Sequence, residues 1–336
     1  MEAYLTVGGS QNLPLYNCSN FTSEEWTARY GVKHPVHGAY SIILGTISLI
    51  CYIPCIFAMC SKDLIRHSCY KIMLCLAFSD IIGIFIGCIF HGYFMIRGYV
   101  FCSMPEIGYI HGCGVMGSWC TESALCFTLA VNRVLEICYP QLAKRIFSGS
   151  KTYLVLMIPL TYGLIAYIIP PPTLFNSAKS GDFYDPGIFD NMSDLYQSTY
   201  QRVNNSFFGL GTSALYMLLC VVFYQKFKEY LGKSNNKMGV HTFIQATIIS
   251  ILNVFVAYIY LFIQYFNLNP IWVHIGHAGY QLIHCCPAFI YLLMNRSIRG
   301  RIRTMLFCRK ENDAKVSGQP NLYGSNQPNQ IGSITV

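Results

Sequence analysis

The sequence predicts an all-α membrane protein, a seven-transmembrane helix bundle followed by a short amphipathic helix on the membrane surface. Hydrophobic residues make up 53% of the 336 residues and charged residues only 11%, which is typical of membrane proteins. Seven stretches are long and apolar enough to cross a bilayer. They cover approximately residues 36–59, 68–95, 104–138, 152–174, 206–230, 241–265 and 271–294.

The distribution of lysine and arginine predicts the orientation of these spans. With the N-terminus outside, sixteen basic residues fall on the cytoplasmic side and five outside, which is the bias known as positive-inside. The net charge of +8 is then explained by the membrane orientation of the chain and its attraction to anionic lipid, and it does not indicate nucleic-acid binding. The cytoplasmic set is Lys62, Arg66, Lys144, Arg145, Lys151, Lys226, Lys228, Lys233, Lys237, Arg296, Arg299, Arg301, Arg303, Arg309, Lys310 and Lys315; the external set is Arg29, Lys33, Arg97, Lys179 and Arg202.

Four parts of the chain are expected. Residues 1–35 form an extracellular N-terminal tail, 36–295 the bundle, 296–310 the amphipathic helix and 311–336 a disordered cytoplasmic tail rich in Gly, Asn, Gln, Pro and Ser. A cleaved signal peptide is not expected, because the first residues lack a basic region and an apolar run. A long polar loop is expected over about 175–205. N-glycosylation sequons on the predicted outer side begin at Asn17, Asn20, Asn191 and Asn204.

The third span carries the most informative polar residues. Helical periodicity places Val115, Trp119, Glu122 and Cys126 near the face of Arg133. An arginine at the mouth of an apolar helix requires a partner or a wet cavity. This stripe is expected to face the bundle, either as a structural seam or as the central helix of a receptor.

Two acids lie within predicted spans, Asp80 in the second and Glu122 in the third. Both should face inward, because acids facing lipid are costly. Two nearby carboxylates resist joint ionisation. The alternatives are a sodium ion or proton held between them, or two acids that are each hydrogen-bonded locally.

Histidines are unusually frequent in the spans. His274, His277 and His284 lie near one face of the seventh span, with His91 and His111 on other spans. An intramembrane zinc site is conceivable on these imidazoles. Since no compact His-x-x-x-His pair with a nearby acid is visible, histidines lining a ligand pocket are favoured and no metal is predicted.

The segment after the seventh span resembles a surface helix. Ile298, Ile302 and Met305 recur at helical spacing opposite Arg299 and Arg303, which is typical of a basic amphipathic helix on the inner leaflet. A cysteine at its end, Cys308, is a candidate palmitoylation site.

Several short motifs resemble those of rhodopsin-like G-protein-coupled receptors. Asn132-Arg133 with Pro140 matches the Asp-Arg-Tyr…Pro spacing, and Leu76-Ala77…Asp80 matches the signature of helix two. More specifically, the chain resembles the nematode serpentine chemoreceptors of class T over nearly its whole length before the tail. The carrying pieces are Tyr16-Asn-Cys-Ser19, Glu24-Glu-Trp26, Gly31-Val-Lys-His-Pro35, Tyr52-Ile-Pro-Cys55, Ser68-Cys-Tyr-Lys-Ile-Met73, Trp119-Cys120, Asn132-Arg133 and Pro287-Ala-Phe-Ile-Tyr291.

This resemblance implies a plasma-membrane sensory receptor, expected in sensory cilia, that takes a small external molecule and activates a heterotrimeric G protein. Asn132, Arg133, Glu136 and Tyr291 are then the expected coupling residues. The acid that usually precedes the arginine is replaced by Asn132, which suggests a looser resting state unless Glu136 pairs with the arginine instead.

The resemblance also guides the outer half of the chain. The outer loop lacks the cysteine that usually tethers it, so Cys18 and Cys102, the clear extracellular cysteines, are expected to pair. The ligand pocket is expected to be lined by Val115, Met116, Trp119, Tyr258, His277 and Tyr280, although each of these side chains is equally compatible with ordinary packing.

An aromatic and largely apolar cavity suits a small amphipathic odorant or pheromone-like molecule. No enzymatic activity and no resident cofactor are predicted, apart from the sodium ion considered between the two acids. An intramembrane zinc hydrolase and a small-molecule transporter are the alternatives. A transporter usually shows paired repeats and broken helices, and no repeat is visible in the sequence.

Overall fold

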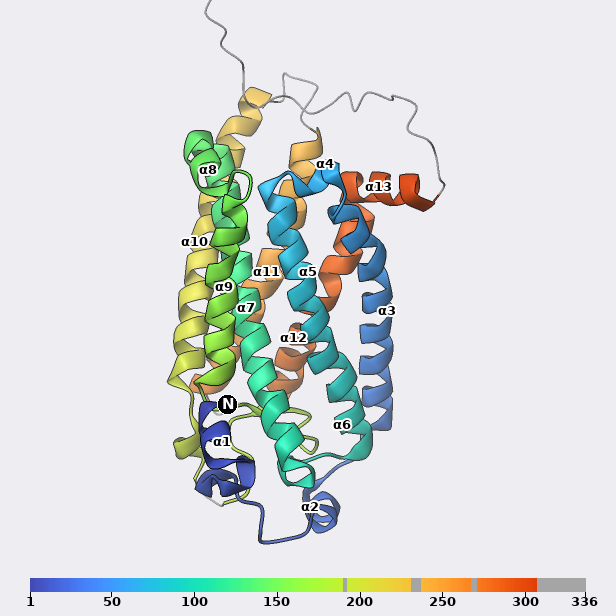
Figure 1. Cartoon of the computed structure of the whole chain (residues 1–336), viewed down its shortest axis with the longest axis vertical. Helices are drawn as coiled ribbons and strands as arrows, with labels where there is room; N and C mark the ends of the chain where they lie inside the picture. Colours follow the sequence, from blue (N-terminus) through green and yellow to red (C-terminus); the bar gives the residue numbers. More distant parts are fainter. Residues whose placement is uncertain (190–191, 231–236, 267–270, 307–336) are drawn as a thin grey trace, which may run out of the picture.

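The computed structural model describes residues 1–189, 192–230, 237–266 and 271–306 (Figure 1). Within these residues, seven helical rods of membrane length lie side by side. They are α3 (Pro35–Met59), the continuous rod of α5 (Ser68–Ile84), η3 (Phe85–Phe90) and α6 (His91–Arg97), then α7 (Pro105–Cys138), α9 (Lys151–Ile168), α10 (Thr199–Tyr230), α11 (Lys237–Tyr265) and α12 (Ile271–Met294).

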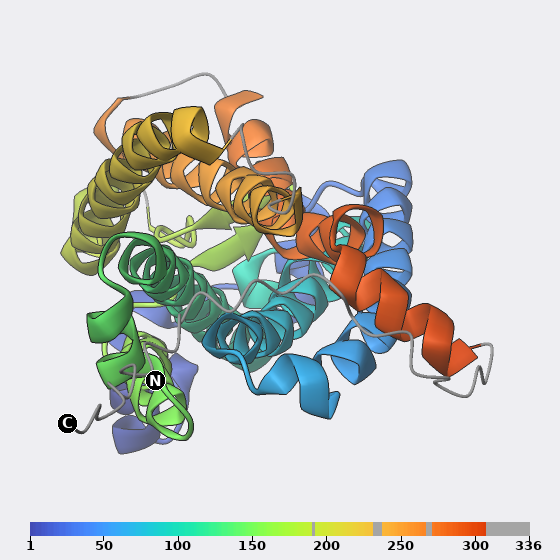
Figure 2. The same cartoon turned by 90° about the horizontal axis from the view of Figure 1, so that it is seen from above.

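Helix α7 is central to the packing. It contacts α5, α9, α10 and α11, and Figure 2 shows it surrounded by these neighbours. Small residues allow its closest approach, because a Cβ on Gly163 of α9 would collide with Thr121 of α7. Such small-residue contacts are common between helices in membranes. A polar side chain on α7 is therefore close to most of the other helices.

The outer surface of the bundle is apolar. Leu154, Ile158 and Leu210 are 72%, 70% and 62% exposed, as expected where lipid rather than water is the neighbour. Among the described residues, four helices are long and apolar enough by composition alone to cross a membrane; they are Pro35–Met59, Ser68–Arg97, Lys151–Ile168 and Thr199–Val222. In α11 the apolar stretch, Thr247–Ile263, is shorter than these four.

The second rod contains a π-helical turn, η3, which the sequence analysis did not predict. A π turn shifts the helical register by one residue and frequently marks a functional site. Side chains of neighbouring helices bond its carbonyls: His111 Nε2 lies 3.3 Å from the Ile86 carbonyl, and Gln281 Nε2 donates to the Gly87 carbonyl at 2.9 Å. The next residue after the turn is His91, which is completely buried.

The loop before α10 is more ordered than the predicted polar loop over 175–205. It forms an antiparallel hairpin of β1 (Leu174–Asn176) and β2 (Gly181–Phe183), followed by η5 (Ser193–Tyr196). Helix α10 then begins at Thr199, before the predicted start near 206. Its first turns contain two polar residues, Asn204 and Asn205, whose side chains are buried inside the bundle. Hydropathy alone therefore does not identify these turns as part of the helix.

The first 34 residues fold over one end of the bundle. They contain α1 (Glu2–Val7), η1 (Ser10–Asn12), η2 (Pro14–Tyr16) and α2 (Ser23–Tyr30). Thr22 and Glu25 form a reciprocal capping box at the start of α2. A disulfide joins Cys18 to Cys102, the pair expected from the sequence. We call this the N-terminal end of the bundle.

Short helices lie at the opposite end, which we call the basic end. They are α4 (Lys62–Ile65), α8 (Pro140–Phe147) and α13 (Arg296–Leu306). Helix α13 projects sideways from the bundle in Figure 2 and is held by an ion pair of 3.6 Å between Arg301 and Asp63. Cys308, the predicted palmitoylation site, lies outside the described residues.

Candidate functional site

At the basic end, a polar network connects α7 to α5. Arg133 Nη1 lies 2.9 Å from Glu136 Oε2, and Ser68 Oγ donates to Glu136 Oε1 at 2.8 Å. Asn132 is fully buried and donates to Ser68 Oγ at 3.1 Å. The arginine thus pairs with the acid one turn later. The looser resting state was suggested on the basis of an arginine without an acidic partner, and the pair with Glu136 removes that basis.

Tyr291 lies deeper, with a completely buried side chain whose hydroxyl has no hydrogen-bond partner among the described residues. One turn later, Asn295 makes the polar contacts: its Nδ2 donates to Gln245 Oε1 at 3.1 Å, and its Oδ1 accepts from the Ile298 amide at 3.0 Å. Asn295 therefore joins α11 to the start of α13. The sequence analysis missed this role, because a single Asn near a helix end gives no pattern.

A buried acid group occupies the middle of the bundle. Tyr52 donates to Asp80 Oδ2 at 2.6 Å, and His284 Nδ1 lies 2.9 Å from Asp80 Oδ1. Glu122 accepts from the Cys126 thiol, while its other oxygen has no hydrogen-bond partner in the described protein. Ligand atoms of Asp80, Glu122 and His284 all lie within 4.8 Å of one another. The two acids predicted to be neighbours are therefore close together, with a histidine hydrogen-bonded to one of them and near the other.

Glycine allows this group to form. A Cβ at Gly83 of α5 would lie 2.6 Å from the ring of His284, closer than side chains tolerate. The missing Cβ lets α12 press its histidine against the second rod. The sequence analysis grouped His284 only with the other histidines, because it is 204 residues from Asp80 along the chain and no pattern links the two.

An aromatic cluster lies between the acid group and the N-terminal end. It contains Met116, Trp119 and Tyr280, three of the predicted pocket residues, each at most 3% exposed. Trp119 Nε1 donates to Asn205 Oδ1 at 2.7 Å, and the Tyr280 and Ser118 hydroxyls lie 2.8 Å apart. The cluster is thus apolar in its body and polar at a few fixed points, as small-molecule sites usually are.

Three predicted pocket residues are not part of this cluster: Tyr258, Val115 and His277, which lies beside the hairpin. Tyr258 is 39% exposed and faces the outside of α11 with Phe255 and Phe262, so it does not line the cluster. Tyr260, two residues later, points inward and stacks edge-on against Trp119 at 5.8 Å. The helical phase was wrong here: Tyr260, seven residues after buried Asn253, lies on the inward face of α11, and Tyr258 does not. Val115 is half-buried, and only its carbonyl has a polar contact, with Ser118.

The hairpin covers the cluster from the N-terminal end. Tyr184, directly after β2, donates to the Met116 sulfur at 3.1 Å and packs against the cluster. Burial strongly raises the pKa of Tyr184, so its hydroxyl stays protonated as this donor. The loop therefore supplies a side chain that the sequence analysis did not include.

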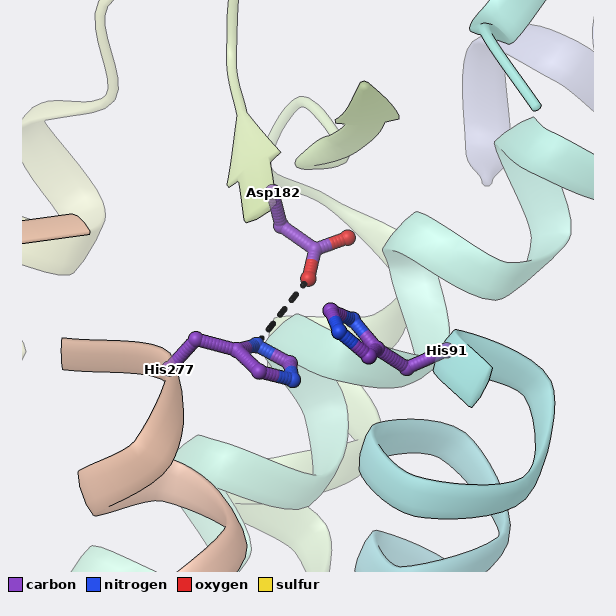
Figure 3. A group of neighbouring side chains, drawn as sticks. All are labelled: His91, Asp182 and His277. Carbon is purple, nitrogen blue, oxygen red and sulfur yellow. Dashed lines mark ion pairs between the residues drawn. The ribbon is translucent and has the colours of Figure 1, made fainter. Parts of the chain in front are cut away.

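Three buried histidines and the half-buried carboxylate of Asp182 meet at the hairpin. Asp182 of β2 lies 3.9 Å from His277 Nδ1 and 3.9 Å from His111 Nδ1. The rings of His277 and His91 stack with centroids 3.6 Å apart, and Figure 3 shows His91 and His277 on either side of the carboxylate. Burial raises the pKa of Asp182 to about 7. The sequence analysis found the histidines but not the acid, which comes from the loop.

The sequons have different environments. Asn20 is exposed, whereas the Asn17 amide is half-buried and donates to the Gln11 carbonyl at 3.1 Å. Asn204 is 1% exposed inside α10 and accepts from the Tyr162 hydroxyl at 2.9 Å. Its predicted glycosylation is therefore wrong for the folded protein, because the acceptor amide points into the bundle. Asn191 lies outside the described residues.

The seven helical rods with inward-facing polar groups are consistent with a serpentine receptor. Sequence comparison identifies the family. The profile of the family "Serpentine type 7TM GPCR chemoreceptor Srt" matches residues 3–315. The chain therefore belongs to this family of multi-pass membrane chemoreceptors. It is also similar to Serpentine receptor class T-55 of Caenorhabditis elegans, with 23% identity over 314 residues, or 93% of this chain and 86% of that protein.

Membership confirms the predicted fold class and the resemblance to class T receptors. It favours a chemoreceptor over the zinc hydrolase and the transporter raised by the sequence, since the matched family is one of chemoreceptors.

Proposed function

We propose that the protein binds a small external molecule in the half of the bundle nearest the N-terminal end and activates a heterotrimeric G protein at the basic end. One observation carries this proposal: the same helix, α7, contributes to both ends. It presents Met116 and Trp119 to the aromatic cluster. At the other end it presents Asn132, Arg133 and Glu136 to the polar network. A ligand that moves α7 acts on both ends.

The N-terminal end faces outside in this proposal, and the basic end faces the cytoplasm. The disulfide between Cys18 and Cys102 supports this orientation, because disulfides persist in oxidising surroundings. Arg301 and Arg303 on α13 would then face the anionic inner leaflet. Exposed Asn20 is the glycosylation site this orientation favours.

The ligand is a small amphipathic molecule of the odorant or pheromone kind. Aromatic rings of Trp119, Tyr260 and Tyr280 supply apolar area, while the Ser118 and Asn205 side chains offer hydrogen bonds. Because the cluster is packed in this structure, a ligand must displace side chains to enter. Tyr184, which reaches in from the loop, is the side chain that moves at the lowest cost.

A sodium ion or a proton between Asp80 and Glu122 would bias the resting bundle. Support comes from the unpartnered Glu122 oxygen and the separation within 4.8 Å of the Asp80, Glu122 and His284 ligand atoms. Replacing sodium with a larger monovalent cation should then change ligand affinity in wild type and not in Glu122→Gln.

The receptor proposal is tested in cells expressing the chain with a panel of G proteins and small amphipathic molecules. Wild type is compared with Arg133→Ala at matched surface expression. We expect a ligand response in wild type that Arg133→Ala lacks. Equal responses in both would contradict the role given to the basic end.

A further inference from the structure

The four polar groups beside the hairpin have buried atoms without adequate partners. Within the described residues, neither ring nitrogen of His91 has a hydrogen-bond partner, nor do His277 Nε2, His111 Nδ1 and Asp182 Oδ1. Buried polar atoms in native proteins are nearly always paired. So many unpaired atoms at one place point to something the protein binds there.

The orientation of His111 indicates what kind of group this is. Its Nε2 lies 3.3 Å from the Ile86 carbonyl of the π turn. A carbonyl only accepts, so Nε2 carries the proton and Nδ1 presents a lone pair toward Asp182 Oδ1 at 3.9 Å. A lone pair facing a carboxylate needs a proton or a cation between them. A histidine whose second nitrogen donates to a backbone carbonyl is also the usual arrangement of a metal ligand.

We propose that His91, His277 and Asp182 form a binding site for a divalent transition-metal ion of the zinc class, with His111 beside it. Their ligand atoms lie within 4.8 Å of one another and come from three elements, α6, α12 and β2 (Figure 3). Imidazole and carboxylate are ligands that zinc prefers. Because zinc–ligand bonds are about 2.0–2.2 Å, the site must contract and the stacked rings of His91 and His277 must rotate.

The hairpin is the element with the fewest restraints on this adjustment. Asp182 lies on a two-stranded hairpin rather than in a helix, so its position depends on few hydrogen bonds. His91 is the first residue of α6 after the π turn, and His277 lies in α12 beside Gly276, where the missing Cβ lets α12 approach α11 closely. Bound metal would tie β2 to α6 and α12. Tyr184 follows two residues after Asp182, so the ion would also hold the loop over the aromatic cluster.

The site is distinct from the acid group in the middle of the bundle, and it does not depend on the receptor proposal. Metal binding is measured on the purified full chain in lipid nanodiscs, without G protein or odorant. The protein is stripped with chelator and titrated with zinc chloride, followed by calorimetry and metal analysis. Failure here leaves the signalling proposal untouched.

We expect saturable binding of one zinc per chain, lost in His91→Ala/His277→Ala and retained in His67→Ala. His67 lies before α5 at the basic end and controls for histidine removal in general. Asp182→Asn keeps the size of the side chain and is expected to weaken zinc binding more than the ~10–100-fold typical of changes at residues that only hydrogen-bond to a ligand. Cobalt in place of zinc should give visible absorption bands from nitrogen and oxygen ligands in wild type.

Absence of binding in wild type would overturn the proposal, as would equal binding in wild type and the double variant. If the double variant does not fold, Asp182→Asn and the cobalt spectrum give the answer alone. Zinc affinity unchanged by Asp182→Asn, together with no cobalt bands, would show that a proton rather than a metal lies between these groups.

Discussion

Replacing Ser68 by alanine removes a hydroxyl that joins α5 to the arginine network of α7. Ser68 Oγ donates to Glu136 and accepts from Asn132, so both contacts disappear while the Arg133–Glu136 pair remains. If activation separates α5 from α7 at this end, the change weakens the resting state only.

The magnitude follows from the charge and exposure of the acceptor. A hydrogen bond to a charged group contributes about 1.5–3 kcal/mol. The Glu136 side chain is 33% exposed, and solvent screening lowers the value to about 1–1.5 kcal/mol. This corresponds to a shift of about 5–12-fold toward the active state. A receptor about 1% active at rest would become about 5–11% active.

Ligand-free G-protein activation at matched surface expression measures this shift. Ser68→Thr keeps the hydroxyl and serves as the control, with basal activity near wild type. Basal activity of Ser68→Ala equal to that of wild type, at equal expression, would refute the idea that this contact holds the resting state.

Three further outcomes are expected. Cys18→Ser should lower stability by up to about 4–5 kcal/mol, since the bond to Cys102 closes a separation of 84 residues; thermal unfolding in nanodiscs measures it, and an unchanged midpoint would count against a stabilising disulfide. Asn20→Gln should remove one glycan on gels, whereas Asn204→Gln should leave mobility unchanged; a glycan lost from the second variant would mean that α10 begins later than in the structure. Tyr184→Ala should uncover the aromatic cluster and broaden the range of active ligands in a response panel, and an unaltered range would argue against a covering role.

The number, order and approximate bounds of the long helices could be predicted from the sequence, because apolar length is a local signal. The start of α10 could not, since Asn204 and Asn205 are polar residues that face inward. The phase of α11 was also wrong. Buried Asn253 indicates the inward face of α11, which Tyr260 shares seven residues later by packing on Trp119, whereas Tyr258 faces outward.

Contacts within one helix and acids buried in apolar spans could be predicted, whereas the site that includes a loop residue could not. Arg133 and Glu136 are one turn apart, so their pairing could be anticipated from the sequence. Asp182 lies in a loop far along the chain from His91 and His277, and only the folded hairpin brings them together. The π turn that places His91 inside has no sequence signal that we recognise.

The most direct test of the central claim uses purified components. Nucleotide exchange on purified heterotrimeric G proteins is measured with the full chain in nanodiscs, for wild type and Arg133→Ala, with and without an active small molecule. The account predicts exchange that wild type accelerates, that the ligand increases and that Arg133→Ala abolishes. Acceleration that is equal in wild type and Arg133→Ala, or no acceleration with any G-protein subtype, would contradict it.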